Sequence, residues 1–284
     1  MLLWIYLIYT ALNMFLRRDR FRFHAYYVPF YYQRILTHPE PGFTILPDTS
    51  RSRCPFVSVS IYGTHPRYYD GLTALIQQVP QVLPHWNIRV YCHDMVPIKY
   101  QNMMRSHRHV ELVMVHDPMV APGNSSGMFW RFMPAAEKGR RFIVLDIDEE
   151  LKPDILHAID IWEKSNLPYF RLNLHTSTDN PSNVLWPEDC WVGGKWGCDG
   201  SVSIPASYLS TFPHRSTFGS DECWLKFVLS PFARAQGLCT VYKNRLHAHL
   251  AKITLWPPQH LSDDHPWRIP SKSSLINEKT YVLY

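Results

Sequence analysis

Between residues 56 and 174, two kinds of hydrophobic pattern alternate along the chain. Short runs rich in β-branched residues are separated by stretches whose apolar residues recur at helical spacing. The short runs predict strands at 56–63, 87–94, 110–117, 141–148 and 169–174. The stretches between them predict helices at 68–83, 97–107, 127–139 and 153–165. Pro80 is expected to kink or stop the first helix, and Gly139 to end the third.

Strands that alternate with helices over short connections are typical of βαβ units. The pattern therefore predicts an α/β, Rossmann-like fold, with a mainly parallel sheet covered by helices on both faces. Past residue 175 the pattern weakens into a Gly- and Trp-rich stretch at 190–200, a helical stretch at 220–237 and an apolar stretch at 238–250. We expect a catalytic domain over 50–250 and a C-terminal tail, 251–284, that packs on it.

The N-terminal segment, 1–34, combines an apolar stretch with a basic one. Leu2 to Leu16 is apolar except for Thr10 and Asn13, and the sequence RRDRFR follows at once. As a helix, this stretch spans ~22 Å, less than the ~30 Å hydrocarbon core of a membrane. It lacks the flanking features of a cleaved signal peptide. A short signal-anchor, an interfacial helix and a helix packed on the domain remain as interpretations.

The arginines and aromatic residues that follow the apolar stretch favour a membrane surface as a partner. If the stretch spans the membrane, the positive charges on its C-terminal side place the catalytic domain in the cytoplasm. The net charge of +5 points to no other anionic partner, because residues 17–34 carry five arginines against one aspartate. A nucleic-acid-binding protein spreads basic charge over a folded face, so we expect no nucleic-acid partner.

The six cysteines form neither CxxC pairs nor the dense spacing of a small disulfide-rich domain. We expect free and mostly buried thiols, as in a reducing compartment. A bridge between Cys190 and Cys198 stays an alternative.

The fourth predicted strand ends in acidic residues, within the sequence RFIVLDIDEE at 141–150. Alternate side chains of an extended chain share a face, so Asp146 and Asp148 are expected to point the same way. Ligands of open α/β sheets bind at the carboxyl ends of the strands. Two close carboxylates repel each other, and Mn²⁺ or Mg²⁺ relieves the repulsion while it also binds phosphate oxygens.

The motif therefore predicts a metal ion that links the protein to a diphosphate. The alternative is structural: Asp148, Glu149 and Glu150 favour the N-terminus of the next helix, which begins near Pro153.

The sequence FWRFMPAAEKGRRFIVLDID, residues 129–148, resembles the GT-A-fold glycosyltransferases that use nucleotide sugars, above all those of polysaccharide and viral glycan pathways. Three later segments are similar to further elements of that family: VGGKWGCDGSVSI at 192–204 to a glycine-rich acceptor-side segment, FGSDECWLKFVLSP at 218–231 to an acidic segment with a helix, and RLHAHL at 245–250 to the segment of a late metal-binding histidine. The resemblance covers roughly residues 55–250.

The resemblance implies roles for residues at the donor side. Asp146 would face the ribose or the metal, and Asp148 would be the principal ligand of Mn²⁺ or Mg²⁺. Tyr62 and Gly63 would border the nucleotide, and Asp94 would bind its base or ribose.

Arg131 would orient Asp146 or contact a phosphate, and its alternative is an ordinary ion pair. His247 or His249 would complete the metal shell.

On the acceptor side, the resemblance implies Asp221 and Glu222 as candidates for the catalytic base or for acceptor binding. Gly194 would lie in the acceptor segment. Trp191 and Trp196 would stack on a sugar face, with burial in the core as the equal default. Segment 118–127, rich in Gly and Ser, would act as a lid over the donor.

The function implied is metal-dependent transfer of a sugar from a nucleoside-diphosphate sugar to a hydroxyl of a carbohydrate or glycoconjugate acceptor. Whether the anomeric centre is inverted or retained stays open. One alternative is a haloacid-dehalogenase-like phosphohydrolase, although its motif normally ends the first strand and has Thr or Val where Glu150 stands. The other alternative is a non-catalytic carbohydrate-binding or scaffold protein on a GT-A-like frame.

Overall fold

The computed structural model describes residues 42–45, 53–117, 126–175, 195–204, 221, 224–225, 229–244, 250–256 and 279–282. Segment 1–34, expected to contact a membrane, lies outside these residues, as does most of the expected lid at 118–127. No helix within the described ranges is long and apolar enough to cross a membrane.

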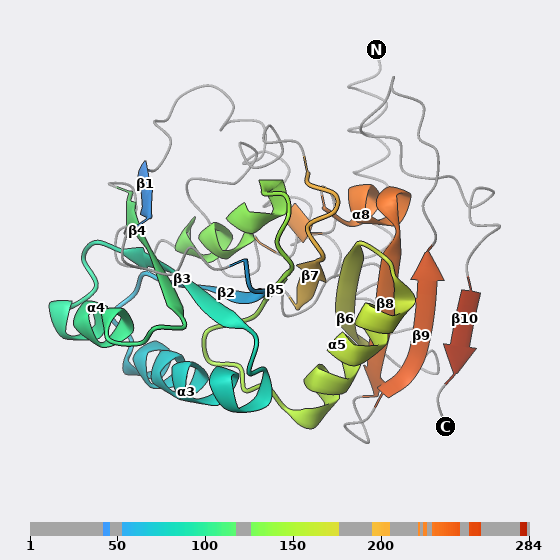
Figure 1. Cartoon of the computed structure of the whole chain (residues 1–284), viewed down its shortest axis with the longest axis horizontal. Helices are drawn as coiled ribbons and strands as arrows, with labels where there is room; N and C mark the ends of the chain where they lie inside the picture. Colours follow the sequence, from blue (N-terminus) through green and yellow to red (C-terminus); the bar gives the residue numbers. More distant parts are fainter. Residues whose placement is uncertain are drawn as a thin grey trace, which may run out of the picture.

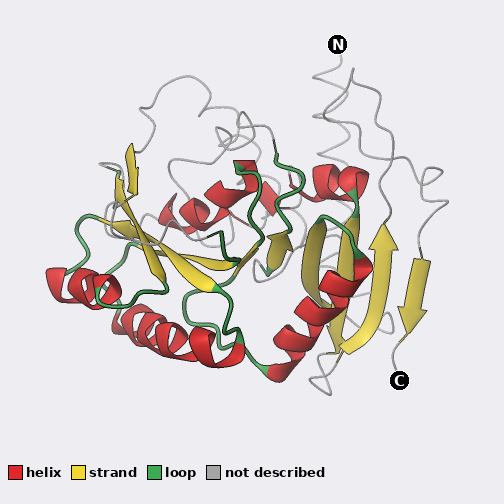
Figure 2. Ribbon diagram, in the orientation of Figure 1, coloured by secondary structure: helices red, strands yellow, loops and turns green. Residues whose placement is uncertain are grey.

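The described strands form one mixed sheet (Figures 1 and 2), in the order β1-β4-β3-β2-β5-β7-β6-β8-β9-β10. Their bounds are β1 Gly42–Ile45, β2 Phe56–Ile61, β3 Asn87–His93, β4 Val110–His116, β5 Phe142–Val144, β6 Tyr169–His175, β7 Trp196–Cys198, β8 Leu238–Asn244, β9 Leu250–Trp256 and β10 Lys279–Val282. Strands β2, β3, β4 and β5 are parallel neighbours, and β6 pairs with β8 in parallel. The antiparallel strand β7 lies between β5 and β6. This mixed α/β sheet agrees with the predicted fold class.

The helices lie on both faces of the sheet, as Figure 2 shows. Their bounds are α3 Pro66–Val82, α4 Ile98–Arg105, η2 Ser126–Ala136, α5 Pro153–Ser165 and α8 Ser230–Gln236. Alternate strand residues supply two cores. Val57 and Ile143 pack into the core with α3, α4 and α5, whereas Phe56 and Phe142 pack into the core with η2 and α8.

Helix α3 continues through Pro80 and ends at Val82. The prediction that Pro80 stops the helix is therefore wrong, and the alternative, a kink at Pro80, stays a prediction. A proline inside a helix leaves the carbonyl four residues earlier without its amide donor. Here that carbonyl belongs to Ile76, and it accepts a hydrogen bond from His109 Nε2 at 2.8 Å. The donor that α3 lacks is therefore supplied by a side chain that lies just before β4.

Helix η2, predicted to be an ordinary helix over 127–139, is a 3₁₀ helix that ends at Ala136. In a 3₁₀ helix each amide donates to the carbonyl three residues earlier, so Pro134 leaves the carbonyl of Arg131 without that donor. This carbonyl accepts from Ser58 Oγ, of β2, at 2.7 Å. The hydrogen bond thus joins η2 to β2.

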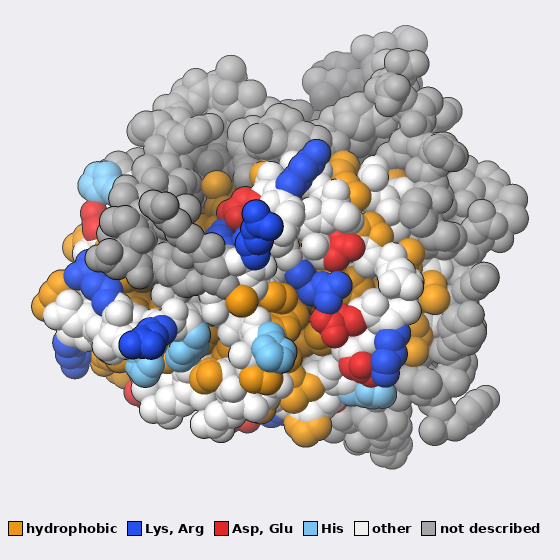
Figure 3. All heavy atoms as spheres, viewed as in Figure 1, with side chains coloured by type: hydrophobic (Ala, Val, Ile, Leu, Met, Phe, Trp, Pro, Cys, Tyr) orange, Lys and Arg blue, Asp and Glu red, His pale blue; other side chains and the backbone are white. Residues whose placement is uncertain are grey.

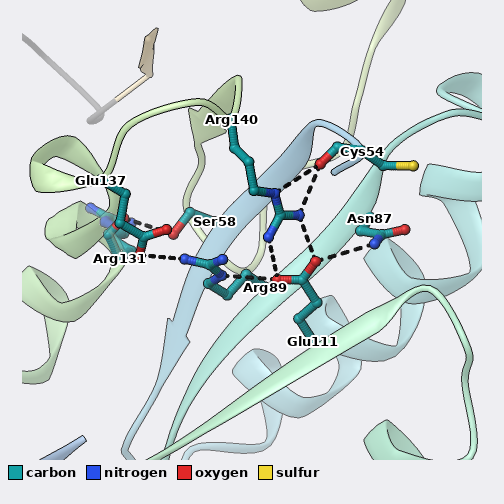
Figure 4. A network of polar contacts seen from close by, with 8 residues as sticks. All are labelled: Cys54, Ser58, Asn87, Arg89, Glu111, Arg131, Glu137 and Arg140. Atoms are coloured by element: carbon teal, nitrogen blue, oxygen red, sulfur yellow. Dashed lines mark hydrogen bonds and ion pairs between the residues drawn. The ribbon is translucent and has the colours of Figure 1, made fainter. Parts of the chain in front are cut away.

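A buried network of ion pairs lies at the amino ends of the parallel strands (Figure 4). Glu111, 3% exposed, accepts from Arg89 Nε at 3.1 Å and from Arg140 Nη2 at 2.6 Å. Both guanidinium groups also lie over the ring of Phe56, at 4.1 and 4.4 Å from its centroid. Because ligands of such sheets bind at the opposite, carboxyl ends, this network is structural.

Cys92, Cys198 and Cys239 are buried thiols that form no disulfide, as predicted. Burial raises the pKa of Cys92 to about 12, so its thiol stays protonated. Cys190 lies outside the described residues. On the face shown in Figure 3, the described basic and acidic side chains are interspersed.

Candidate functional site

The site predicted from the acidic motif lies where the order of the strands reverses. Strand β2 has β3 on one side and β5 on the other, and the chain reaches β5 only after β3 and β4. In open α/β sheets, this reversal opens the ligand crevice at the carboxyl ends of the strands. Tyr62 and Gly63 follow β2, Asp94 follows β3, and Asp146 follows β5. The fold therefore places these four predicted donor residues at one edge of the sheet.

Strand β5 is shorter than predicted, because it ends at Val144 and the chain turns at 147–148. The prediction that Asp146 and Asp148 share a face because the strand extends through them is wrong. Burial still alternates past the strand: Leu145 and Ile147 are 1% and 6% exposed, whereas the side chains of Asp146 and Asp148 are 36% and 18% exposed. Each of these carboxylates contacts a different arginine.

Arg131, from η2, joins two predicted site residues. Its Nη1 donates to Asp146 Oδ1 and, at 3.2 Å, to the carbonyl of Leu145. Its Nη2 donates to Asp221 Oδ2 at 2.9 Å. Arg131 and Asp221 are only 6% and 8% exposed. Arg131 thus contacts Asp146, as either an orienting residue or an ordinary ion pair would, and its role at the site stays a prediction. One guanidinium shared by two carboxylates leaves this group with a formal charge of −1.

Tyr62 lies beside this group and is held by aromatic packing. Its ring meets that of Trp130 edge-on, with centroids 5.8 Å apart. The glycine at 127 permits this position, because a Cβ there would collide with the tyrosine ring. Burial raises the pKa of Tyr62 to about 12, although the nearby Arg131 lowers it. The phenol is therefore a neutral hydrogen-bond donor at physiological pH.

Asp148 forms an ion pair with Arg67, from the first turn of α3. The arginine side chain is 72% exposed and the aspartate side chain 18%. Helix α3 touches the same turn at Gly71, where a Cβ would come within 2.6 Å of the Ile147 oxygen and 2.7 Å of the Asp148 Cα. The lack of a side chain at position 71 therefore lets α3 pack directly on the backbone of the acidic turn.

Mn²⁺ and Mg²⁺ bind mainly to oxygen ligands, such as the carboxylates of the acidic turn. In the described part of the chain, no group of three or more His, Cys, Asp or Glu side chains is placed to hold a metal ion. Asp146 forms an ion pair with the buried Arg131, whereas Asp148 forms one with Arg67, whose side chain is mostly exposed. Of the two carboxylates, Asp148 therefore has the partner that can be displaced more easily. His247 and His249 lie outside the described residues.

Asp94 forms a second polar group at the ends of β3 and β4. Its Oδ2 accepts from His116 Nδ1 at 2.6 Å, and this hydrogen bond is the main reason why the pKa of Asp94 is lowered. The neighbouring His93 stacks on Trp130, with ring centroids 5.8 Å apart. The ring of Trp130 therefore contacts both His93, next to Asp94, and Tyr62.

Other predicted residues are less favourably placed or not described. Trp196 is fully buried in β7, with its ring 5.3 Å from that of Phe142. Of the two expectations for Trp196, burial in the core is confirmed and stacking on an acceptor sugar is wrong, because its side chain packs in the core with η2 and α8. Trp191, Gly194 and Glu222 lie outside the described residues.

Sequence reasoning missed Arg67 as a partner of Asp148. The position of Arg67, near the start of the helix that follows the first parallel strand, could have indicated this pairing. Sequence reasoning also treated Glu149 as part of a helix N-terminus, whereas Glu149 pairs with Lys195 Nζ at 2.9 Å.

No model of a known protein family matches the sequence, and no curated protein matches it. Three solved structures resemble the fold at a distance. Residues 1–349 of TarS from S. aureus align with a TM-score of 0.40 at 10% identity, over 64% of this chain and 56% of that one. The mannosyltransferase PcManGT from Pyrobaculum calidifontis, solved with GDP-Man and Mn²⁺, aligns with a TM-score of 0.38 at 14% identity, over 75% and 62%.

The mannosyltransferase Ktr4p from S. cerevisiae aligns with a TM-score of 0.36 at 11% identity, over 87% of this chain and 86% of that one. The chain spans less than two thirds of the length of the first two. Two of the three proteins are mannosyltransferases. Likenesses of this size assign no activity to the present chain.

Proposed function

We propose that this chain transfers a sugar from a nucleoside-diphosphate sugar to a hydroxyl of a carbohydrate or glycoconjugate, with the help of Mn²⁺ or Mg²⁺. The observation that carries the proposal is the position of the acidic turn. Asp146 and Asp148 follow β5 directly beside the end of β2, at the point where the strand order reverses. This is the edge at which sheets of this kind bind nucleotides.

Each described residue has a role that follows from its contacts. Arg131 holds Asp146 in place from the buried side and ties it to Asp221. Tyr62 offers a neutral phenol to the nucleotide, and the open space around Gly63 lets a ligand approach the backbone. Asp94 is a hydrogen-bond acceptor for the base or ribose. Asp148 would hold the cation, which would offset the charge that develops on the diphosphate leaving group.

Of the two candidates for the catalytic base, Asp221 and Glu222, the contacts of Asp221 favour Glu222. Asp221 is buried and its Oδ2 accepts from Arg131, so it suits the fixing of Arg131 better than the removal of a proton from an acceptor. A base must reach the acceptor hydroxyl directly or through one water. Glu222, its neighbour in sequence, is then the candidate base for an inverting transfer, and a retaining transfer needs no such base.

A screen of nucleotide sugars for Mn²⁺-dependent hydrolysis tests the proposal. The protein should release a nucleoside diphosphate from at least one donor, and Asp148→Asn should abolish both turnover and Mn²⁺-dependent nucleotide binding. Asp160→Asn is a matched control, because Asp160 pairs with Lys164 on the exposed surface of α5. Calorimetry with GDP and UDP measures binding separately from turnover.

The outcomes separate the alternatives. Donor binding without turnover in any acceptor mixture would favour a carbohydrate-binding or scaffold protein. Phosphate release from phosphomonoesters, with no effect of nucleotide sugars, would favour a phosphohydrolase with Asp146 as the nucleophile. Equal nucleotide affinity in wild type and Asp148→Asn would overturn the metal assignment.

We also propose that segment 1–34 brings the protein to a membrane surface, with the catalytic domain on the cytoplasmic side. The support is its sequence, an apolar stretch followed by five arginines. Flotation of the full chain with vesicles that contain anionic lipid should recover the protein, and a chain that begins at residue 35 should stay behind. Equal recovery of both chains would contradict the proposal.

A further inference from the structure

We infer that Arg67 is a built-in counter-cation for Asp148, which a divalent metal displaces so that the arginine turns to the diphosphate of the donor. This inference rests on the proposed function, and it assigns to Arg67 a part in donor binding that the motif alone does not indicate. The observation behind it is the ion pair between Arg67 and Asp148 at the edge of the sheet where the nucleotide is expected.

The two partners of this ion pair are held very differently. Asp148 sits in a turn whose backbone is packed against α3 at Gly71, so the carboxylate has little freedom to move. Arg67 is fixed only through its backbone, whose amide donates to the Nδ1 of His65 at 3.3 Å. Its side chain is 72% exposed, and an exposed arginine side chain changes rotamer rapidly. The cation can therefore leave while the carboxylate stays.

The other carboxylate of the motif shows the contrast. Asp146 pairs with Arg131, which is 6% exposed and also donates to Leu145 and Asp221. Displacing Arg131 would leave several buried groups without their donor, at a large cost. An exposed ion pair of the kind that Arg67 makes is weak. Exchange of a cation is therefore expected at Asp148 and not at Asp146.

The displaced arginine remains close to the bound donor. Arg67 lies in the first turn of α3, and α3 begins four residues after Tyr62, which is expected to border the nucleotide. A guanidinium binds phosphate oxygens in a fork and keeps its charge at every physiological pH. The same side chain thus offsets the charge of Asp148 before the metal binds and that of the diphosphate afterwards.

Calorimetric titration of the full chain with MnCl₂ alone tests the first half of the inference. Arg67→Ala should bind Mn²⁺ about two- to fivefold more tightly than wild type, because it removes a competitor as strong as an exposed ion pair. Arg67→Lys should lie between the two, because lysine keeps the charge without the fork. Arg108→Ala is the control: Arg108 is also exposed, but it lies just before the amino end of β4.

Titration with GDP and UDP at saturating Mn²⁺ tests the second half. The nucleotide that wild type binds should bind at least about tenfold more weakly to Arg67→Ala, since one charge-assisted contact to phosphate is lost. Opposite shifts for metal and nucleotide are the signature of the exchange.

The inference would be overturned if Arg67→Ala bound Mn²⁺ as tightly as wild type or more weakly. If Asp148→Asn also abolished Mn²⁺ binding, the proposed metal site would stand without the inference. An absence of Mn²⁺ binding in wild type and in Arg67→Ala would overturn both the inference and the proposed metal dependence. Weaker nucleotide binding to Arg67→Ala without Mn²⁺ as well as with it would show that the arginine contacts phosphate without exchange, which also overturns the inference.

Discussion

Replacing Arg131 by methionine would remove the cation that lies between Asp146 and Asp221 while it keeps much of the side-chain volume. The guanidinium is 6% exposed and donates to both carboxylates and to the carbonyl of Leu145. After the replacement, Asp221 would be a buried carboxylate deprived of this donor. The expected result is a large loss of stability and a disordered arrangement of the site.

The size of the loss follows from burial. Removing one partner of a buried ion pair costs about 3–5 kcal/mol, because the remaining charge loses its compensation. Asp221 is 8% exposed, so it cannot regain hydration without movement. The side chain of Asp146 is 36% exposed and can be hydrated, which places the expected loss near the lower end, at about 3 kcal/mol. For a domain of this size, that corresponds to a fall in Tm of roughly 6–12 °C.

Thermal and denaturant unfolding followed by circular dichroism measure this loss. The double variant Arg131→Met/Asp221→Asn should recover about 1–2 kcal/mol relative to Arg131→Met, because the amide carries no charge to bury. Arg108→Met, at an exposed position, should stay within about 0.5 kcal/mol of wild type. A stability of Arg131→Met equal to that of this control, or no recovery in the double variant, would refute the reasoning.

Three further predictions concern other parts of the site and of the sheet. Gly71→Ala should lose about 1–2 kcal/mol in thermal unfolding, since overpacking against the backbone at Asp148 costs more than the ~1 kcal/mol gained in helix propensity; a gain in stability would contradict the contact. Glu111→Gln should lose about 3 kcal/mol in denaturant unfolding, because it removes the charge that the buried Arg89 and the half-buried Arg140 share, yet leave nucleotide affinity in calorimetry unchanged. His116→Phe should raise the pKa of Asp94, read from its carboxyl carbon-13 shift, because the hydrogen bond that lowers it is lost. The stability that this pair provides is present above the unfolded pKa of about 3.9 and is lost as the pH falls through the folded value, so the variant should lose less stability in acid than wild type.

The elements that the sequence predicts best are those whose signal is local. Helix α5 begins at Pro153 and ends at Ser165, as its apolar spacing and its proline at the first position predict. The first three parallel strands agree with the prediction to within two residues at their ends.

What the sequence could not show depends on contacts between distant segments. Tryptophan is a residue type that stacks on sugars, but the strand of Trp196 pairs with β5 and β6 inside the sheet. Because β7 is only three residues long, its hydrophobic pattern is too short to reveal this pairing. The pairing of Arg67 with Asp148 needs α3 to lie against the acidic turn, which depends on Gly71. The acidic motif itself was recognisable because its chemistry and its strand are adjacent in sequence.

The bridge from Arg131 to Asp221 joins residues 90 positions apart, and this separation sets an order of assembly. During synthesis at about 5–20 residues per second, Arg131 leaves the ribosome roughly 5–18 s before Asp221. In that interval the arginine has Asp146 within reach, so a neutral pair can form on the nascent half-sheet. The arrival of Asp221 then adds the second carboxylate and changes the charge of the group. The site thus acquires its final electrostatic character only after Asp221 has been synthesised and has reached Arg131.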